Sequence, residues 1–75
     1  MQEADIRLLF DCGNLKSVTI TRAPLAEGWC LQFSRKGGGC EVLDSQRVSP
    51  RTFKTLDAAF LAAYRIGFSE ATVAG

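Results

Sequence analysis

Residues 55–67 read Thr-Leu-Asp-Ala-Ala-Phe-Leu-Ala-Ala-Tyr-Arg-Ile-Gly, and this stretch decides the fold that we expect for the chain. Its apolar residues recur at spacings of three and four, which is the period of an amphipathic helix. Thr55 is a suitable N-cap, and Gly67 followed by Phe68 is typical of a Schellman ending. The sequence therefore predicts a helix from 56 to about 66. Its sheet-facing stripe is expected to be Leu56, Ala59, Phe60, Ala63 and Tyr64.

The opposite side of this helix is also apolar, where a surface helix normally carries charges. Contiguous exposed apolar surface usually marks an interface, so this side favours a homodimer or a partner groove. The alternative is that an N-terminal strand or the tail 71–73 covers it. The expected interface residues are Leu61, Ala62, Arg65 and Ile66.

The chain before the helix has the alternating pattern of strands, clearest where Trp29, Leu31 and Phe33 share one face. Short turns separate the expected strands, which are 5–11, 15–22, 29–34, 40–44 and 51–54. Short turns join antiparallel neighbours. The predicted fold class is therefore α+β, with an antiparallel β-meander of four to five strands packed on one C-terminal amphipathic helix. We expect a single domain of residues 1–75.

Length and composition narrow the class of protein. The 75 residues are 47% hydrophobic, which is enough for one core, but a domain of this size buries only about 60% of its unfolded surface. Oligomerisation would add to that stability. No apolar run reaches the ~20 residues of a membrane span, and the acidic start of the chain is unlike a signal peptide. We expect a cytoplasmic protein that does not bind membranes.

The cysteines and glycines do not predict a cofactor. Three cysteines without paired spacing, and no histidine, favour free thiols over a disulfide framework or a zinc site. Gly37-Gly38-Gly39 resembles a phosphate loop in composition, but such loops lead into a helix, whereas a strand pattern follows here. We therefore interpret the glycines as a hairpin tip and expect neither metal nor cofactor.

The residues needed for catalysis are missing from the sequence. There is no histidine, and no serine or cysteine occupies a nucleophile-elbow motif. The carboxylates are spaced as solvent-facing strand and turn positions, which does not indicate an acid/base pair. We expect a protein that is not an enzyme and has no small-molecule substrate.

Positive charge is concentrated in one segment. The chain has a net charge of +1, yet residues 35–54 alone carry +3, from five basic and two acidic side chains. A local cationic segment of this kind favours an anionic partner such as nucleic acid. The alternative is a solvated hairpin whose charges keep the protein soluble. The predicted nucleic-acid-binding residues are Arg35, Lys36, Arg47, Arg51 and Lys54.

The junction between this segment and the helix, residues 51–59, reads Arg-Thr-Phe-Lys-Thr-Leu-Asp-Ala-Ala. Together with the Trp29-containing strand and the closing Ile66-Gly67-Phe68, it resembles ParC-like partition-associated proteins, which are small accessory proteins of bacterial plasmids and integrative elements. The resemblance covers residues 29–73. It implies a non-catalytic accessory or regulatory protein of a mobile element.

The order of strands followed by one helix is also similar to sheet-type DNA readers, such as the plant ethylene-response domain and the arm-binding domain of phage integrases. That resemblance implies strand side chains in the major groove and a helix behind the sheet. Because the chain is nearly neutral, we expect weak, salt-sensitive DNA binding that a homodimer strengthens. One alternative is a protein–protein interaction module that uses a strand edge or the apolar back of the helix. A housekeeping domain is a third possibility.

Overall fold

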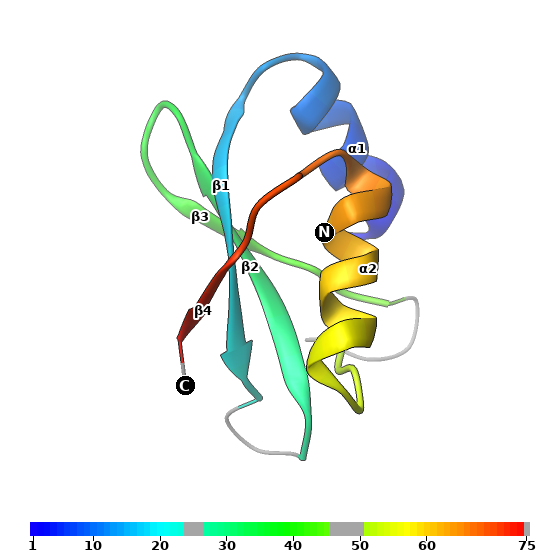
Figure 1. Cartoon of the computed structure of the whole chain (residues 1–75). Helices are drawn as coiled ribbons and strands as arrows, with labels where there is room; N and C mark the ends of the chain where they lie inside the picture. The colour runs from blue at the N-terminus through cyan, green and yellow to red at the C-terminus, as the bar shows by residue number, and fades with distance from the viewer. Residues whose placement is uncertain (24–26, 46–50, 75) are drawn as a thin grey trace.

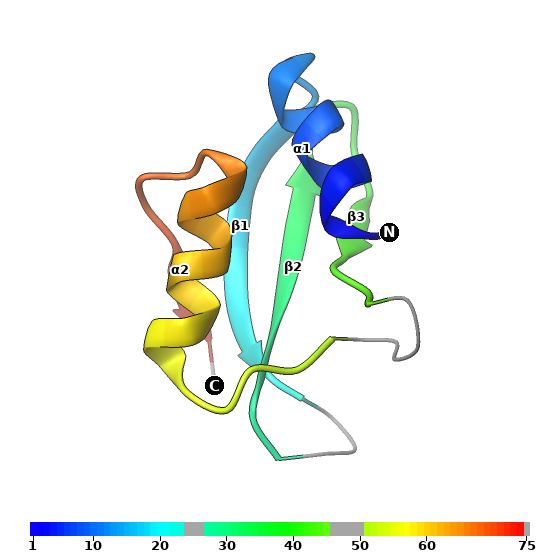
Figure 2. The ribbon, with the colours of Figure 1, turned by 90° about the vertical axis from the view of Figure 1, so that its right-hand side faces the viewer.

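The computed structural model of the chain describes residues 1–23, 27–45 and 51–74. Both helices lie on the same side of one sheet, as Figures 1 and 2 show together. The expected α+β class is confirmed. In chain order the elements are α1 (Glu3–Asp11), β1 (Leu15–Arg22), β2 (Trp29–Arg35), β3 (Cys40–Val42), α2 (Leu56–Ile66) and β4 (Thr72–Ala74).

The sheet is mixed, which corrects the predicted antiparallel meander. Its strand order is β3-β2-β1-β4, and the β1–β2 and β2–β3 pairs are antiparallel. β4 pairs with β1 in parallel, with Ile20 opposite Val73. Parallel neighbours need a long crossover, and the chain from β1 to β4 includes α2, so β4 returns to the sheet in the direction of β1.

Residues 5–11 are the main error of the sequence prediction, because they belong to helix α1 and not to a strand. Ile6, Leu8 and Phe10 do alternate, but Ile6, Leu9 and Phe10 also satisfy the helical spacing of three and four. Ile6 is fully buried and Leu9 and Phe10 pack against the core, whereas Leu8 is 64% exposed. The helical period is therefore the one that buries apolar surface.

Both ends of α1 have local causes. Glu3 and Asp5 place negative charge in the first turn, where the helix dipole favours it. At the other end Gly13 has a φ of 76°, and the Asn14 N–H donates to the Leu9 carbonyl at 2.9 Å. This is a Schellman ending. The turn predicted at residues 12–14 is present, but it joins a helix to β1.

Helix α2 begins and ends where the sequence predicts. The Ala58 N–H donates to Oγ1 of Thr55 at 3.1 Å, so Thr55 is the N-cap. Gly67 has a φ of 135°, and the Phe68 N–H donates to the Ala63 carbonyl at 3.1 Å. The predicted Schellman ending is confirmed.

The faces of α2 agree with the prediction in part, because Ala59 and Ala63 of the expected stripe are fully buried. Its buried residues are Ala59, Ala62, Ala63 and Ile66, whereas Leu56, Phe60 and Tyr64 of the expected stripe are exposed. The observed buried residues and the predicted stripe both recur at spacings of three, four and seven. The sequence pattern alone therefore does not decide which of these two faces is buried. The observed choice turns small alanines toward the sheet, and the larger side chains remain outside.

The remaining strand predictions are partly confirmed. Leu31 and Phe33 of β2 face the core and are fully buried, as expected. The predicted strand 40–44 is shorter, and the predicted strand 51–54 is reduced to one antiparallel bridge between Phe53 and Trp29. The turn expected near residues 45–50 falls largely on residues 46–50, outside the described residues.

One core lies between the sheet and the two helices. Phe68 follows α2 and joins the two helices to the sheet, because its ring lies 4.9 Å from that of Phe10 and 5.9 Å from that of Phe33, measured between centroids. The other large, fully buried side chains are Ile6, Ile20, Leu31, Leu43 and Val18. In the described ranges, no helix is long and apolar enough to cross a membrane.

Candidate functional site

The predicted nucleic-acid-binding residues do not gather on one surface. Arg35 and Lys36 lie where β2 turns toward β3, whereas Lys54 lies near Trp29 at the opposite end of β2. Six residue steps along a strand span about 20 Å, so the two groups are well separated. Arg47 lies outside the described residues.

Arg51 belongs to neither group. Its guanidinium carbon lies 4.9 Å from the centroid of the Phe53 ring, and one of its nitrogens lies 4.0 Å from Oε1 of Glu3. Oε1 of Glu3 also accepts a hydrogen bond of 3.1 Å from Arg65. One carboxylate thus lies between two guanidinium groups and links α1 to α2 and to the segment before it.

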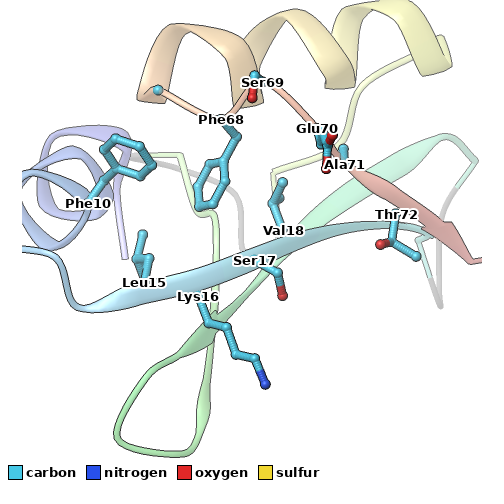
Figure 3. Close-up of a pocket in the computed structure, with 11 residues that line it drawn as sticks. Phe10, Leu15, Lys16, Ser17, Val18, Phe68, Ser69, Glu70, Ala71 and Thr72 are labelled. Atoms are coloured by element: carbon cyan, nitrogen blue, oxygen red, sulfur yellow. The ribbon is translucent and has the colours of Figure 1, made fainter.

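The face of the sheet away from the helices is polar but almost uncharged. Cross-strand pairs set Thr19 opposite Gln32 and Thr21 opposite Cys30 on this open face. Lys16, next to a register shift in β1, points away from the helices (Figure 3). Among the predicted DNA-binding residues that are described, only Arg35 lies in a named strand, and its partner Leu15 faces the core. The open face therefore lacks the basic side chains that the sheet-type readers imply.

A cleft at one end of the sheet brings together two cations and an indole. We call it the Trp29 cleft. The guanidinium carbon of Arg22 lies 4.7 Å from the centroid of the Trp29 ring, a cation–π contact. Reciprocal hydrogen bonds between Trp29 and Phe53, of 2.8 and 2.7 Å, hold Lys54 close by. The cleft has a volume of about 380 Å³, and its lining is Arg22, Glu27, Gly28, Trp29 and Lys54.

A second hollow, also of about 380 Å³, lies between the start of β1 and the segment that links α2 to β4. β4 pairs with β1 only from Thr19 onward, so the sheet has no fourth strand beside residues 15–18. Phe10, Phe68, Leu15 and Val18 give this hollow an apolar floor, and Glu70 lies on its rim (Figure 3). Its other polar lining residues are Lys16, Ser17, Ser69 and Thr72, and no polar or charged side chain is buried in the described part of the chain.

The most unusual surface is the side of α2 that faces away from the sheet. Four large side chains are exposed there, by 37% for Leu56, 39% for Phe60, 57% for Leu61 and 64% for Tyr64. At 100° per residue they fall within one arc of the helix, opposite the alanine-rich buried face. We call these four residues the outer face of α2. Asp57 lies within the same arc, and Arg65 lies at its border.

The predicted interface is only partly on this surface. Leu61 and Arg65 are exposed, but Ala62 and Ile66 are 0% and 4% exposed and belong to the core. Those two are therefore not available to a partner in the folded chain. The expected alternative cover also differs, since residues 72–74 join the sheet as β4 instead of crossing the helix.

No protein-family model, no curated protein and no solved structure matches this chain. The resemblance to ParC-like proteins therefore stays a prediction.

Metal-ligating residues and free thiols are placed as follows. Among the described residues, no three His, Cys, Asp or Glu side chains lie together as a metal site. Cys12 and Cys40 are exposed free thiols, and Cys30 is a buried one whose Sγ lies 3.2 Å from Oγ1 of Thr21.

Sequence reasoning missed the Trp29 cleft and three members of the outer face of α2, which are Leu56, Phe60 and Tyr64. The cleft had a usable signal, because Arg22 and Trp29 bracket a short connection between adjacent strands and therefore pair directly. The outer face had a weaker sequence signal. The spacing of Phe60 and Tyr64 fits a sheet-facing side of the helix as well as the outward-facing side on which they lie.

Proposed function

We propose that this chain is a non-catalytic protein-interaction module and that the outer face of α2 is its binding surface. The observation that carries the proposal is the exposure of four large apolar side chains on the side of α2 that faces away from the core. Contiguous exposed apolar surface in a small protein is typical of an interaction site.

The outer face of α2 is not explained by folding. The inner side of the helix already packs on the sheet through Ala59, Ala62, Ala63 and Ile66, so the large residues outside add little to the core. A helix that needed only to cover a sheet would carry polar residues there. Aromatic residues such as Phe60 and Tyr64 are also enriched in interface cores.

Site-specific photo-crosslinking tests the surface without assuming the partner. A photo-reactive phenylalanine analogue at position 64 should give a discrete crosslinked adduct in cells that express the protein. The same analogue at position 19, on the open face of the sheet, is the control and should give none. Adducts at both positions, or at neither, would contradict the proposal.

A matched pair of substitutions adds a second control. Leu61→Glu should abolish the adduct at position 64, whereas Leu8→Glu should not. Leu8 is 64% exposed and Leu61 is 57% exposed, and both lie in helices, so the two substitutions place the same charge in similar local settings. Exposed helical positions tolerate glutamate well, so both variants should unfold within about 0.5 kcal/mol of the unsubstituted protein.

A second candidate function is weak DNA binding by an accessory protein, and the Trp29 cleft favours it. Arg22 and Lys54 supply two cations there, and Trp29 supplies a ring surface for stacking. The basic residues at the far end of β2 and the neutral open face do not add to this site. We therefore rank DNA binding below protein interaction.

Fluorescence anisotropy with random duplex DNA at low and moderate salt tests this second function. The Arg22→Gln, Lys54→Gln pair should weaken binding and lower the slope of log affinity against log salt by about 2, one for each lost phosphate contact. Lys36→Gln, at the other end of β2, is the control and should leave the slope nearly unchanged. Absence of binding at low salt would exclude the function.

A further inference from the structure

We infer that the partner bound by the outer face of α2 is a second copy of this chain, with the two α2 helices packed antiparallel about a two-fold axis. This inference rests on the proposed function of the outer face of α2 and names its partner. The reason is that this face is complementary to itself.

The charges at the two ends of the face are opposite in sign. Asp57 lies in the first turn of α2, within the arc of the exposed apolar residues, and Arg65 lies in the last turn, at the border of that arc. Within the described residues, Asp57 forms no ion pair. Arg65 is held 3.1 Å from Glu3 of α1 and its side chain remains 52% exposed. A two-fold axis between two copies places the Asp57 end of one helix beside the Arg65 end of the other.

The positions of these two charges along α2 are compatible with an antiparallel pair centred on the outer face. The outer face of α2 is centred near residue 60, and an antiparallel copy with its axis there sets Asp57 within about 3 Å of the height of the partner's Arg65. Two such pairs form, one on each side of the axis. The helix dipoles also run in opposite directions, which a parallel arrangement would not allow.

The exposed area is that of a weak dimer. Taking about 200 Å² for a fully exposed large side chain, the four residues leave roughly 400 Å² open in each copy. Two copies would bury roughly 800 Å² from these residues alone, below the ~1,200 Å² that begins the range of stable interfaces. Flanking side chains add to this, but the area stays small, so we expect a weak dimer with a dissociation constant on the order of 100 µM.

Sedimentation velocity from about 1 µM to about 1 mM protein tests the self-association. The chain should shift from monomer to dimer across this range. Leu61→Glu should weaken the dimer at least about tenfold, because it buries a carboxylate near the axis. Leu8→Glu should leave the dissociation constant unchanged.

Charge reversal tests the antiparallel register. Asp57→Arg alone and Arg65→Asp alone should each weaken the dimer several-fold, and the double variant should restore it. Both reversals disfavour the helix itself, since they oppose its dipole, so restoration cannot come from a more stable helix. Glu3→Gln removes the intramolecular partner of Arg65 and is the control, with a dimer as tight as before.

The outcomes separate this inference from the proposed function. A chain that stays monomeric throughout the concentration range would overturn the inference that the partner is a second copy. The proposed function would still hold if position 64 formed an adduct with a different protein. A dimer insensitive to Leu61→Glu would show that the dimer forms through another surface and would overturn this inference, whereas the absence of an adduct at position 64 would overturn the proposed function. Failure of the double reversal to restore the dimer would overturn the antiparallel arrangement.

Discussion

At the scale of single residues, Gly67 has two roles: it ends helix α2, and it leaves room for the Phe10 ring of α1. Its φ of 135° is rare for residues with a side chain, and a Cβ added there would lie 2.4 Å from Cε1 of Phe10. The Phe10 ring cannot retreat easily, because it packs edge-on against Phe68. The residue that ends α2 therefore also packs against a side chain of α1.

Gly67→Ala should destabilise the fold by about 2–4 kcal/mol, which combines the cost of a left-handed backbone with overpacking. Gly13→Ala is the matched control, because Gly13 also has a positive φ of 76° but open space around it. It should cost only about 1–2 kcal/mol. Urea unfolding of both variants measures the difference, and equal losses would show that the contact with Phe10 contributes nothing.

Residues were predictable from sequence where a single local rule applied. Thr55 and Gly67 follow rules of capping that need no knowledge of the rest of the chain. The burial of Ala62 and Ile66 was not predictable in this way, because two helical stripes satisfy the same spacing. Only the sheet below α2 selects between them.

At the scale of elements, β4 is the strand that the sequence pattern did not predict. It has three residues, all exposed, and it is held by parallel pairing of Thr72, Val73 and Ala74 with β1. Such a short run carries no readable alternation. Its partner depends on where the chain emerges after α2, which is a property of the assembled fold.

Removal of residues 72–75 should free one edge of β1 and leave the β2–β3 pairing intact. Hydrogen exchange followed by NMR should show loss of protection in residues 19–21 of β1, with a loss of stability of about 1–2 kcal/mol. Val73→Thr keeps a residue suited to strands and serves as the control, with protection retained. Equal loss of protection in β3 would mean that β4 stabilises the whole sheet.

The other elements show why some predictions succeeded. β1, β2 and α2 each carry one dominant period together with clear end signals, and their observed bounds agree with the prediction to within a residue. The segment that forms α1 satisfies two periods over only a few residues. The helix is favoured there because Ile6, Leu9 and Phe10 then reach the core together.

At the scale of the whole molecule, Cys30 is a buried thiol on the face of the sheet away from the helices, outside the core between the two layers. Cys30 is 6% exposed, whereas Cys12 and Cys40 are exposed. Reaction of the buried thiol requires an opening of the fold, and the exposed thiols need none.

A thiol reagent that gives a coloured product should therefore react in two phases. Two thiols should react at the rate of a free cysteine, and the third should react slowly and faster with added urea. Cys30→Ala should remove only the slow phase. Three thiols reacting at one rate would be inconsistent with the burial of Cys30.

The candidate sites were predictable only in outline. The sequence indicated an under-charged second side of the helix, and the exposure of Leu61 agrees with it. The basic segment is continuous in sequence, but the chain reverses within it. Arg35 and Lys54 therefore lie at opposite ends of β2. Proximity along the chain did not mean proximity in space.

The pairing of Thr19 with Thr72 has a consequence for the newly made chain. The two residues are 53 positions apart, 72 minus 19, so the ribosome must add that many residues before β1 can acquire its parallel neighbour. At roughly 5–20 residues per second this interval lasts about 3–10 s. After β1 has left the ribosome and until β4 has followed it, one edge of β1 has no parallel neighbour and can pair with another chain.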